Sequence, residues 1–238
     1  PLNAVGKELH DELSYVFYDV ARDDECDVVI LTGAGRAFSA GADLPGLLKA
    51  TQDAAHRTAL LSRAPAIVHA LLSLKKPIIA KLNGHAMGLG ATLALLCDVV
   101  IASKDARIAD PHVGIGLSAG DGGALIWPQL IGYARARHHL LTGDPLTASE
   151  AEAIGLIYKA VNPDELTATV DAYADRLASG ATMAIQATKH SINMKLCRQA
   201  VATAEAHAGL ESYTMASNDQ REAVLAFIEK RAPQFKGD

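Results

Sequence analysis

Two glycine-rich segments, each following a largely apolar run, constrain most strongly what this chain can fold into. The run 28–31 leads through a Thr-Gly-Ala-Gly turn into residues 38–43, and the run 77–82 leads into residues 83–90. Short apolar runs that end in turns are typical of buried strands. The residues after Gly90 predict a short helix, whose first turn presents unpaired N–H groups and the positive end of a dipole. The two turns therefore predict a place where backbone N–H groups hold an anion or an oxyanion.

Strand-like and helical patterns alternate along the first two thirds of the chain, and glycine turns rather than long polar linkers separate them. This alternation favours one continuous α/β core, which we assign to residues 1–163. Thr147 and Glu150 have the spacing of a capping box, and Gly155 is placed to end the short helix that they start.

The pattern after residue 163 is helical almost throughout, and we assign residues 164–238 to an all-helical C-terminal region. Asp219 and Glu222 are spaced to cap a last helix that runs toward Lys230.

Composition excludes several classes of protein. Half of the 238 residues are hydrophobic, which is enough for a large core, and the net charge of -5 argues against nucleic acid as a partner. No run reaches a membrane-spanning length and no signal peptide is apparent, so we expect a cytoplasmic protein with no membrane partner. Cys26, Cys97 and Cys197 are far apart and lack ligand spacing, so we expect reduced thiols and no metal site.

The two paired turns and their strands resemble the crotonase superfamily, the family of enoyl-CoA hydratases and isomerases. The similarity continues through residues 97–102, 111–123, 141–143, 151–156 and 226–231. It implies a core spiral of repeated ββα units and a helical C-terminal region at the interface of a homotrimer, often stacked as a hexamer. It also implies an acyl-CoA thioester as the substrate and no permanently bound cofactor, coenzyme A being part of the substrate. Family members usually carry a strand before residues like 1–5, so we expect that the natural N-terminus is missing.

The resemblance places the backbone N–H groups of Ala40 and Leu89 on the thioester carbonyl oxygen. Such fixed donors contribute roughly 3 kcal/mol each to an enolate-like transition state. Many family members have glycine where Leu89 stands, but only the main-chain N–H is needed, and Gly88 and Gly90 keep the turn permissive. The alternative is a pair of ordinary strand-to-helix turns.

Other positions match family residues that lie along coenzyme A, from the pantetheine to the nucleotide. They are Leu2, Ala4, Ala42, Asp43, Leu44, Phe227 and Lys230. In the family, the last two commonly reach a neighbouring subunit's ligand, where a lysine meets a phosphate as a point charge. A solvated basic helix face is the alternative for Lys230.

The chain departs from the family pattern where a hydratase carries its two catalytic glutamates. Thr92 occupies the first position and His112 the second. A hydroxyl orients water but is a poor base at neutral pH, and the alternative for Thr92 is a bond to its own helix backbone.

His112 and Asp121 are spaced so that a loop can fold one against the other. A histidine takes a proton from water, and a carboxylate on its other nitrogen stabilises the imidazolium. The pair resembles a branch of the superfamily that hydrolyses carbon–carbon bonds of cyclic β-diketones. The alternatives are a structural loop histidine and an N-cap role for Asp121 on a helix through residues 124–131. His85 is expected to line the acyl pocket with Gly88 and Thr92.

Three functions follow from these residues. The first is an enoyl-CoA hydratase or isomerase, with Ala40 and Leu89 as oxyanion donors and His112 as the base. The second is a carbon–carbon bond hydrolase of cyclic β-diketones that uses His112 and Asp121. The third is a family member that binds acyl-CoA without catalysis, which only the two missing glutamates support.

Overall fold

The computed structural model describes residues 2–238, so Pro1 lies outside the described residues. The strands are β1 (Val29–Thr32), β2 (Ile78–Leu82), β3 (Ala86–Met87), β4 (Val99–Ser103), β5 (Arg107–Ala109), β6 (Leu146–Thr147) and β7 (Lys159–Val161). The helices of the core are α1 (Lys7–Ala21), α2 (Leu44–Gln52), α3 (Ala54–Leu61), α4 (Ala64–Ser73), α5 (Leu89–Leu95), the 3-10 turn η1 (His112–Ile115), α6 (Gly123–Thr142) and α7 (Ala148–Ala153). The chain ends with α8 (Leu166–Ala178), α9 (Thr182–Met215) and α10 (Asn218–Glu229).

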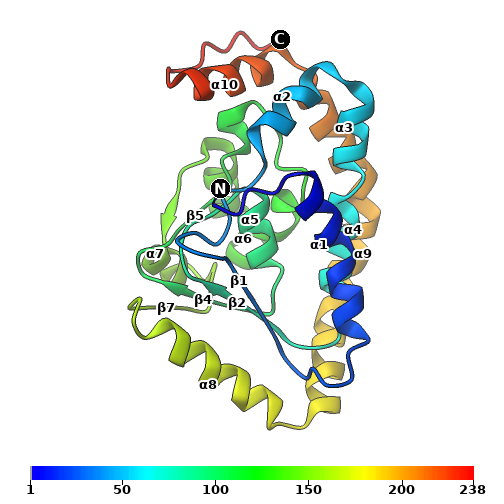
Figure 1. Cartoon of the computed structure of the whole chain (residues 1–238), viewed down its shortest axis with the longest axis vertical. Helices are drawn as coiled ribbons and strands as arrows, with labels where there is room; N and C mark the ends of the chain where they lie inside the picture. Colours follow the sequence, from blue (N-terminus) through cyan, green and yellow to red (C-terminus); the bar gives the residue numbers. More distant parts are fainter. Residues whose placement is uncertain (1) are drawn as a thin grey trace.

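A four-stranded parallel sheet, in the order β1-β2-β4-β7, lies at the centre of the molecule (Figure 1). Its middle strands are buried on both faces, because alternate side chains point to opposite sides of a strand. Ile79 and Ile101 face the side that α8 covers, where they pack with Val170. Ile78 and Ala80 face the main core on the opposite side. Both predicted strands, β1 and β2, are present in this sheet; β2 is buried as expected, whereas β1 is an edge strand with alternate residues exposed.

A second sheet, in the order β3-β5-β6, carries the loops that form the site. Strands β3 and β5 are parallel, and β6 pairs with β5 in the antiparallel direction. Strand β3 lies within the second glycine-rich turn, and η1 begins shortly after β5. The short second sheet therefore brings the turn and the histidine segment to one place.

Helices α1, α4 and α9 pack along one side of the molecule (Figure 1). Within residues 2–238, every element after residue 164 is a helix, as the sequence pattern predicts. Helix α9 packs lengthwise on α4 of the core and is 34 residues long. The C-terminal helices and the core share packed surfaces. The division of the chain into a core and a C-terminal region at residue 163 stays a prediction.

The local helix signals are mostly confirmed. Thr147 and Glu150 form a reciprocal capping box at the start of α7, and Gly155, at φ 79°, follows its end. Helix α6 loses helical geometry at Gly132, where φ is 74°, so its first half ends at Ile131 as predicted.

The predicted cap of the last helix is wrong. The side chain of Ser217, not Asp219, accepts the N–H of Gln220 and caps α10. The carboxylate of Asp219 instead accepts the N–H groups of Lys236 and Gly237 from the C-terminal tail. A Ser two residues earlier has the extended backbone that an N-cap requires, which leaves Asp219 inside the first turn.

Replacing Thr147 with alanine is expected to lower the free energy of unfolding by about 1 kcal/mol, because the N-cap acceptor of α7 is lost. Urea denaturation measures the change. The matched control is Thr188→Ala inside α9, where the hydroxyl bonds only its own helix carbonyl at Ala184 and alanine is a better helix former. Equal effects of the two substitutions would contradict a capping role.

Candidate active site

The two glycine-rich turns lie against each other, as the sequence predicts. The N–H of Met87 donates to the carbonyl of Ser39 at 3.0 Å, and Ser39 forms a parallel bridge with Ala86. Gly41 has φ 82°, and a Cβ atom there would lie 2.6 Å from the carbonyl oxygen of Met87. Only glycine therefore permits this approach of the two backbones.

Helix α5 begins at Leu89, directly after Gly88 at φ 51°, so the Leu89 N–H belongs to the open first turn of a helix. Gly90 packs against the first glycine-rich turn, residues 38–43, since a Cβ on Gly90 would lie 2.6 Å from the Cβ of Ser39. The N–H of Ala40 donates to the carbonyl of Leu2 at 3.0 Å. A thioester oxygen that takes both N–H groups therefore has to displace the Leu2 carbonyl.

His112 lies directly behind the second turn. A Cβ on Gly88 would lie 3.4 Å from Cε1 of the imidazole, and the histidine is only 6% exposed. Its Nδ1 contacts Oδ1 of Asp110, and its Nε2 lies 3.3 Å from Oδ2 of Asp121. The predicted contact between His112 and Asp121 is thus present, with a second carboxylate on the other nitrogen.

The electrostatics of this triad keep the imidazole charged. Burial lowers the pKa of His112, but the charges of Asp121 and Asp110 outweigh it and hold that pKa well above its usual range. Burial raises the pKa of Asp121, yet the nearby His112 charge leaves it lower than usual. Because both ring nitrogens face carboxylates, His112 exchanges protons as a pair with Asp121 rather than as a free imidazole.

Asp110 is a site residue that sequence reasoning missed. It is almost fully buried, and its Oδ2 has no hydrogen-bond partner within residues 2–238. The signal was present in the Asp-Pro-His sequence, because a proline between the two side chains favours a tight turn that folds the carboxylate back onto the ring.

Asp121 links three parts of the site. Its Oδ1 accepts the Gly123 N–H and the Thr92 hydroxyl, each at 3.3 Å. The N-cap of α6 is Gly122, which makes no side-chain cap, so Asp121 contacts the helix start and the histidine together. Thr92 bonds this carboxylate, not its own helix, and so joins the same network.

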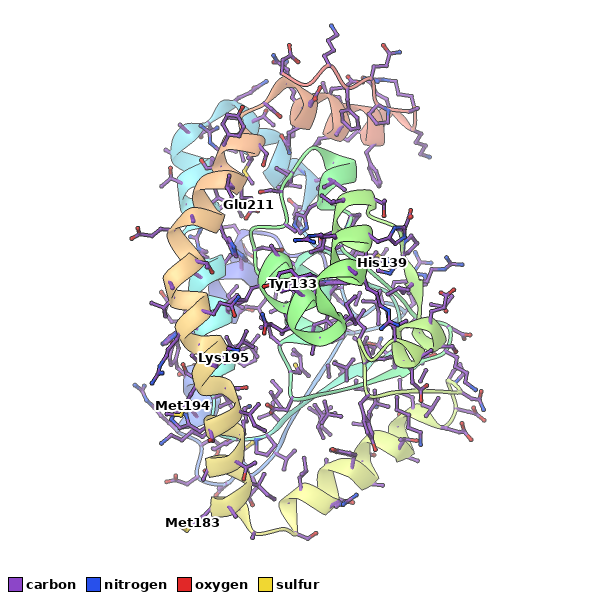
Figure 2. All side chains as sticks on the ribbon, turned by 180° about the vertical axis from the view of Figure 1, so that it is seen from behind. Tyr133, His139, Met183, Met194, Lys195 and Glu211 are labelled. Atoms are coloured by element: carbon purple, nitrogen blue, oxygen red, sulfur yellow. The ribbon has the colours of Figure 1, made fainter. Side chains whose placement is uncertain are left out.

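Glu211 is a second residue that sequence reasoning missed. It lies on α9, far along the chain from Asp121 (Figure 2). Its side chain is only 6% exposed. A Cβ on Gly120 would lie 2.7 Å from its Oε2, which places the carboxyl group beside the loop that carries Asp121. Burial, reinforced by the charge of Asp121, raises the pKa of Glu211 to about 8. Glu211 is therefore protonated at neutral pH.

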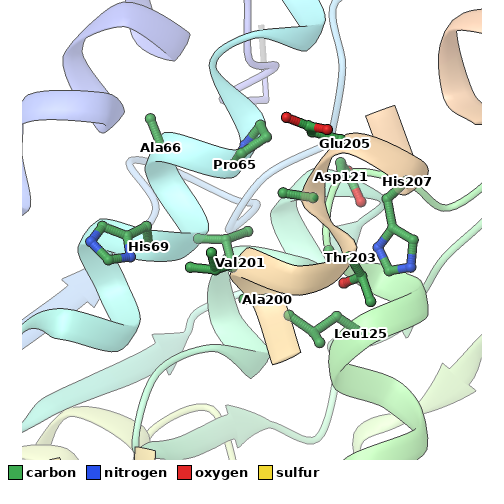
Figure 3. A pocket seen from close by; sticks show the side chains of 14 residues that line it. Pro65, Ala66, His69, Asp121, Leu125, Ala200, Val201, Thr203, Glu205 and His207 are labelled. Carbon is green, nitrogen blue, oxygen red and sulfur yellow. The ribbon is translucent and has the colours of Figure 1, made fainter. Parts of the chain in front are cut away.

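A cavity of about 370 Å³ opens beside Asp121 (Figure 3). The segment 120–122 and Leu125 of α6 border it, with helices α4 and α9 on its other sides. His207 of α9 also lines it, and burial lowers the pKa of this histidine.

The residues matched to coenzyme A lie in two packed segments. Asp43 caps α2 by accepting the Gly46 N–H at 3.0 Å, and Leu44 begins that helix. Helix α10 packs on α2 through a small apolar core, with Phe227 exposed and Lys230 at its C-terminal cap. The two segments that the resemblance assigns to coenzyme A, at α2 and at α10, are therefore close in space. Their contact with a ligand stays a prediction.

His85 makes no contact with the His112 and Asp121 side chains in the structure. Its side chain is exposed, and its Nδ1 accepts the backbone N–H of Arg107 at 3.0 Å. The strand β3 that follows turns Ala86 inward and leaves His85 on the outer side.

Asp110, His112 and Asp121 offer oxygen and nitrogen atoms within 4.8 Å of one another, a spacing that a cation could use. The charged imidazole lies between the two carboxylates and offsets one of their negative charges, and the expected absence of a metal stays a prediction.

All 238 residues match the family model described as Enoyl-CoA hydratase/isomerase. The chain belongs to this family. Short-chain-enoyl-CoA hydratase of Clostridium acetobutylicum is 36% identical to it over 233 residues, covering 97% of this chain and 88% of the relative. 1,2-Epoxyphenylacetyl-CoA isomerase of Escherichia coli is 35% identical, covering 99% and 91%. The crystal structure of an enoyl-CoA hydratase/isomerase from Mycobacterium paratuberculosis has a TM-score of 0.89 at 34% identity, covering 94% of this chain and 89% of that one.

These comparisons confirm the crotonase fold and the hydratase/isomerase family that the two turns indicate. The named relatives are enzymes, which favours catalysis over binding alone for this family member. No helix within residues 2–238 combines the length and apolarity needed to cross a membrane.

Proposed function

We propose that this hydratase/isomerase family member adds water to the double bond next to the thioester of a 2-enoyl-CoA. One observation carries the proposal: the His112 ring lies against Gly88, immediately before the N–H that would hold the thioester oxygen. The oxyanion donors and the proton-transfer groups thus converge on one small region. The substrate itself is coenzyme A-linked, and no permanent cofactor takes part.

The charged groups divide into a base and an acid. Asp121 has a lowered pKa and Glu211 a raised one, and such a divergence separates the two roles at one pH. The Asp121 carboxylate, which the His112 charge keeps ionised, accepts a proton from water while the water oxygen bonds C3. The electrons of the double bond move into a thioester enolate held by the Ala40 and Leu89 N–H groups. Glu211, protonated at neutral pH, supplies the proton that C2 receives.

The direct test is the loss of the conjugated thioester absorbance when the protein meets crotonyl-CoA and longer 2-enoyl-CoA esters. Hydration removes the conjugation, so absorbance falls at a rate proportional to enzyme concentration. Complete absence of turnover with every ester would overturn the proposal.

The oxyanion role of Leu89 has a matched pair of variants. Leu89→Pro removes the N–H, and proline is tolerated at the first helical position, whereas Leu89→Ala removes the side chain and keeps the N–H. We expect Leu89→Pro to lower kcat by about 10²–10³-fold, because one donor to the enolate oxygen is lost. Leu89→Ala is expected to stay within several-fold of the natural enzyme. Similar losses in both variants would show a packing effect instead.

Isomerisation of a double bond is the second candidate reaction, because the same enolate is reprotonated at another carbon and one relative is named an isomerase. The contact between His112 and Asp121 favours a third, the hydrolysis of cyclic β-diketones. Cyclic diketones, free and linked to coenzyme A, are the substrates that distinguish it.

We further propose that the chain assembles as a homotrimer or hexamer in the cytoplasm, and that the coenzyme A positions act within it. Helix α9 carries exposed apolar side chains, including Met183 and Met194, which project outward in Figure 2. Exposed apolar groups on one helix favour a protein interface. All three cysteines are free, as in reducing compartments. Light scattering coupled to size exclusion measures the subunit number.

A further inference from the structure

We propose that the cavity between α4 and α9 binds the acyl chain, and that it selects uncharged acyl groups much longer than the four carbons of crotonyl. This inference rests on the proposed function, because it treats Asp121 as the group beside the reacting carbons. It identifies the α4 and α9 side chains that line this cavity as the determinants of acyl-chain length.

The position of the cavity follows from Asp121. The carbons C2 and C3 lie between the oxyanion donors and the acid–base group, so the rest of the acyl chain has to continue past that group. Asp121 and Gly122 line the cavity at this point. A Cβ on Gly122 would lie 2.7 Å from Cγ2 of Thr92 and 3.2 Å from Cγ2 of Val68, so only glycine fits between Thr92 and the cavity wall that Val68 forms.

The size and lining fit an apolar chain. The cavity volume, about 370 Å³, is within the range that holds drug-sized ligands and exceeds the needs of a four-carbon group. The walls are mostly apolar, and α9 contributes small side chains that leave the space free. The apolar lining residues are Pro65, Ala66, Val68, Leu125, Ala200, Val201 and Ala204.

The polar groups at the cavity argue against a charged acyl tail. Burial lowers the pKa of His207, so its ring is neutral at neutral pH and offers no cation to a carboxylate. Glu205 and Asp121 are the acidic groups that line the space, and they repel an anionic tail. In Figure 3, Glu205 lies at one edge and Asp121 beside His207.

Calorimetric binding of saturated esters tests the inference without turnover. Each CH₂ buried from water contributes roughly fourfold in affinity, so octanoyl-CoA is expected to bind at least about tenfold more tightly than butyryl-CoA. Ala204→Leu fills the cavity and is expected to abolish most of this preference while butyryl-CoA binding stays within about twofold. The matched control is Ala202→Leu, on the exposed side of the same helix, which leaves both affinities unchanged.

Two outcomes overturn the inference alone: equal affinities of the two esters, or a selectivity that Ala204→Leu does not change. Failure of both esters to bind the natural protein overturns the proposed function together with the inference. Butyryl-CoA therefore separates the two failures, because its binding depends on recognition of the CoA thioester and little on the cavity.

Discussion

Replacing His112 with alanine is expected to lower kcat/KM for 2-enoyl-CoA by about 10³-fold, within the range that proton-transfer groups contribute. The imidazolium separates Asp110 from Asp121, and both carboxylates are almost fully buried. Without the positive charge the two anions repel each other, and Asp121 takes up a proton and ceases to act as a base. Absorbance kinetics with crotonyl-CoA measure the loss.

The control separates chemistry from folding. Asp110→Asn keeps the shape of the site and the contact between His112 and Asp121, but it removes one of the charges that raise the pKa of His112. We expect this variant to stay active and to shift the pH–rate profile toward lower pH. Butyryl-CoA binding by His112→Ala shows whether the variant is folded. Full turnover in a folded His112→Ala protein would contradict the assignment of His112 and Asp121.

The parts of the site that local sequence determines could be predicted, and those that tertiary packing determines could not. The pairing of residues 38–43 with residues 83–90 was predictable, because glycines after buried strands mark tight turns. Asp110 is only two residues from His112, but the sequence offers both Asp110 and Asp121 as partners and does not show that His112 contacts both. Glu211 had no signal, because a single glutamate on a long helix is usually exposed.

The incorrect expectations have similar physical causes. Ser217 caps α10 instead of Asp219, because both are acceptable capping residues and only Ser217 has the extended backbone at the helix start. His85 was expected to line the acyl pocket because it belongs to the turn. Side chains alternate across a strand, so Ala86 takes the inward position and His85 is exposed, and its contact with an acyl group stays a prediction.

Glu211→Gln is expected to make the protein increasingly more stable than its natural form as the pH rises. Glutamate has an ordinary pKa of 4.5, but the folded-state pKa of Glu211 is raised to about 8. Between these values the folded protein holds a proton that the unfolded chain has released, so rising pH favours unfolding. The contribution of this one group to the free energy of unfolding therefore falls by roughly 1.4 kcal/mol per pH unit.

The experiment compares urea denaturation of the two proteins between pH 5.5 and pH 7.5, with Glu205→Gln as the control. Glu205 lies on the same helix but is exposed, so its variant is expected to follow the natural protein at every pH. Glutamine cannot lose a proton, so the stability difference for Glu211→Gln should grow across this interval by on the order of 2–3 kcal/mol. The same substitution removes the proposed proton donor, and hydration should slow even at pH 6, where the fold is intact. A stability difference independent of pH would show that Glu211 is ionised in the folded protein and is not the acid.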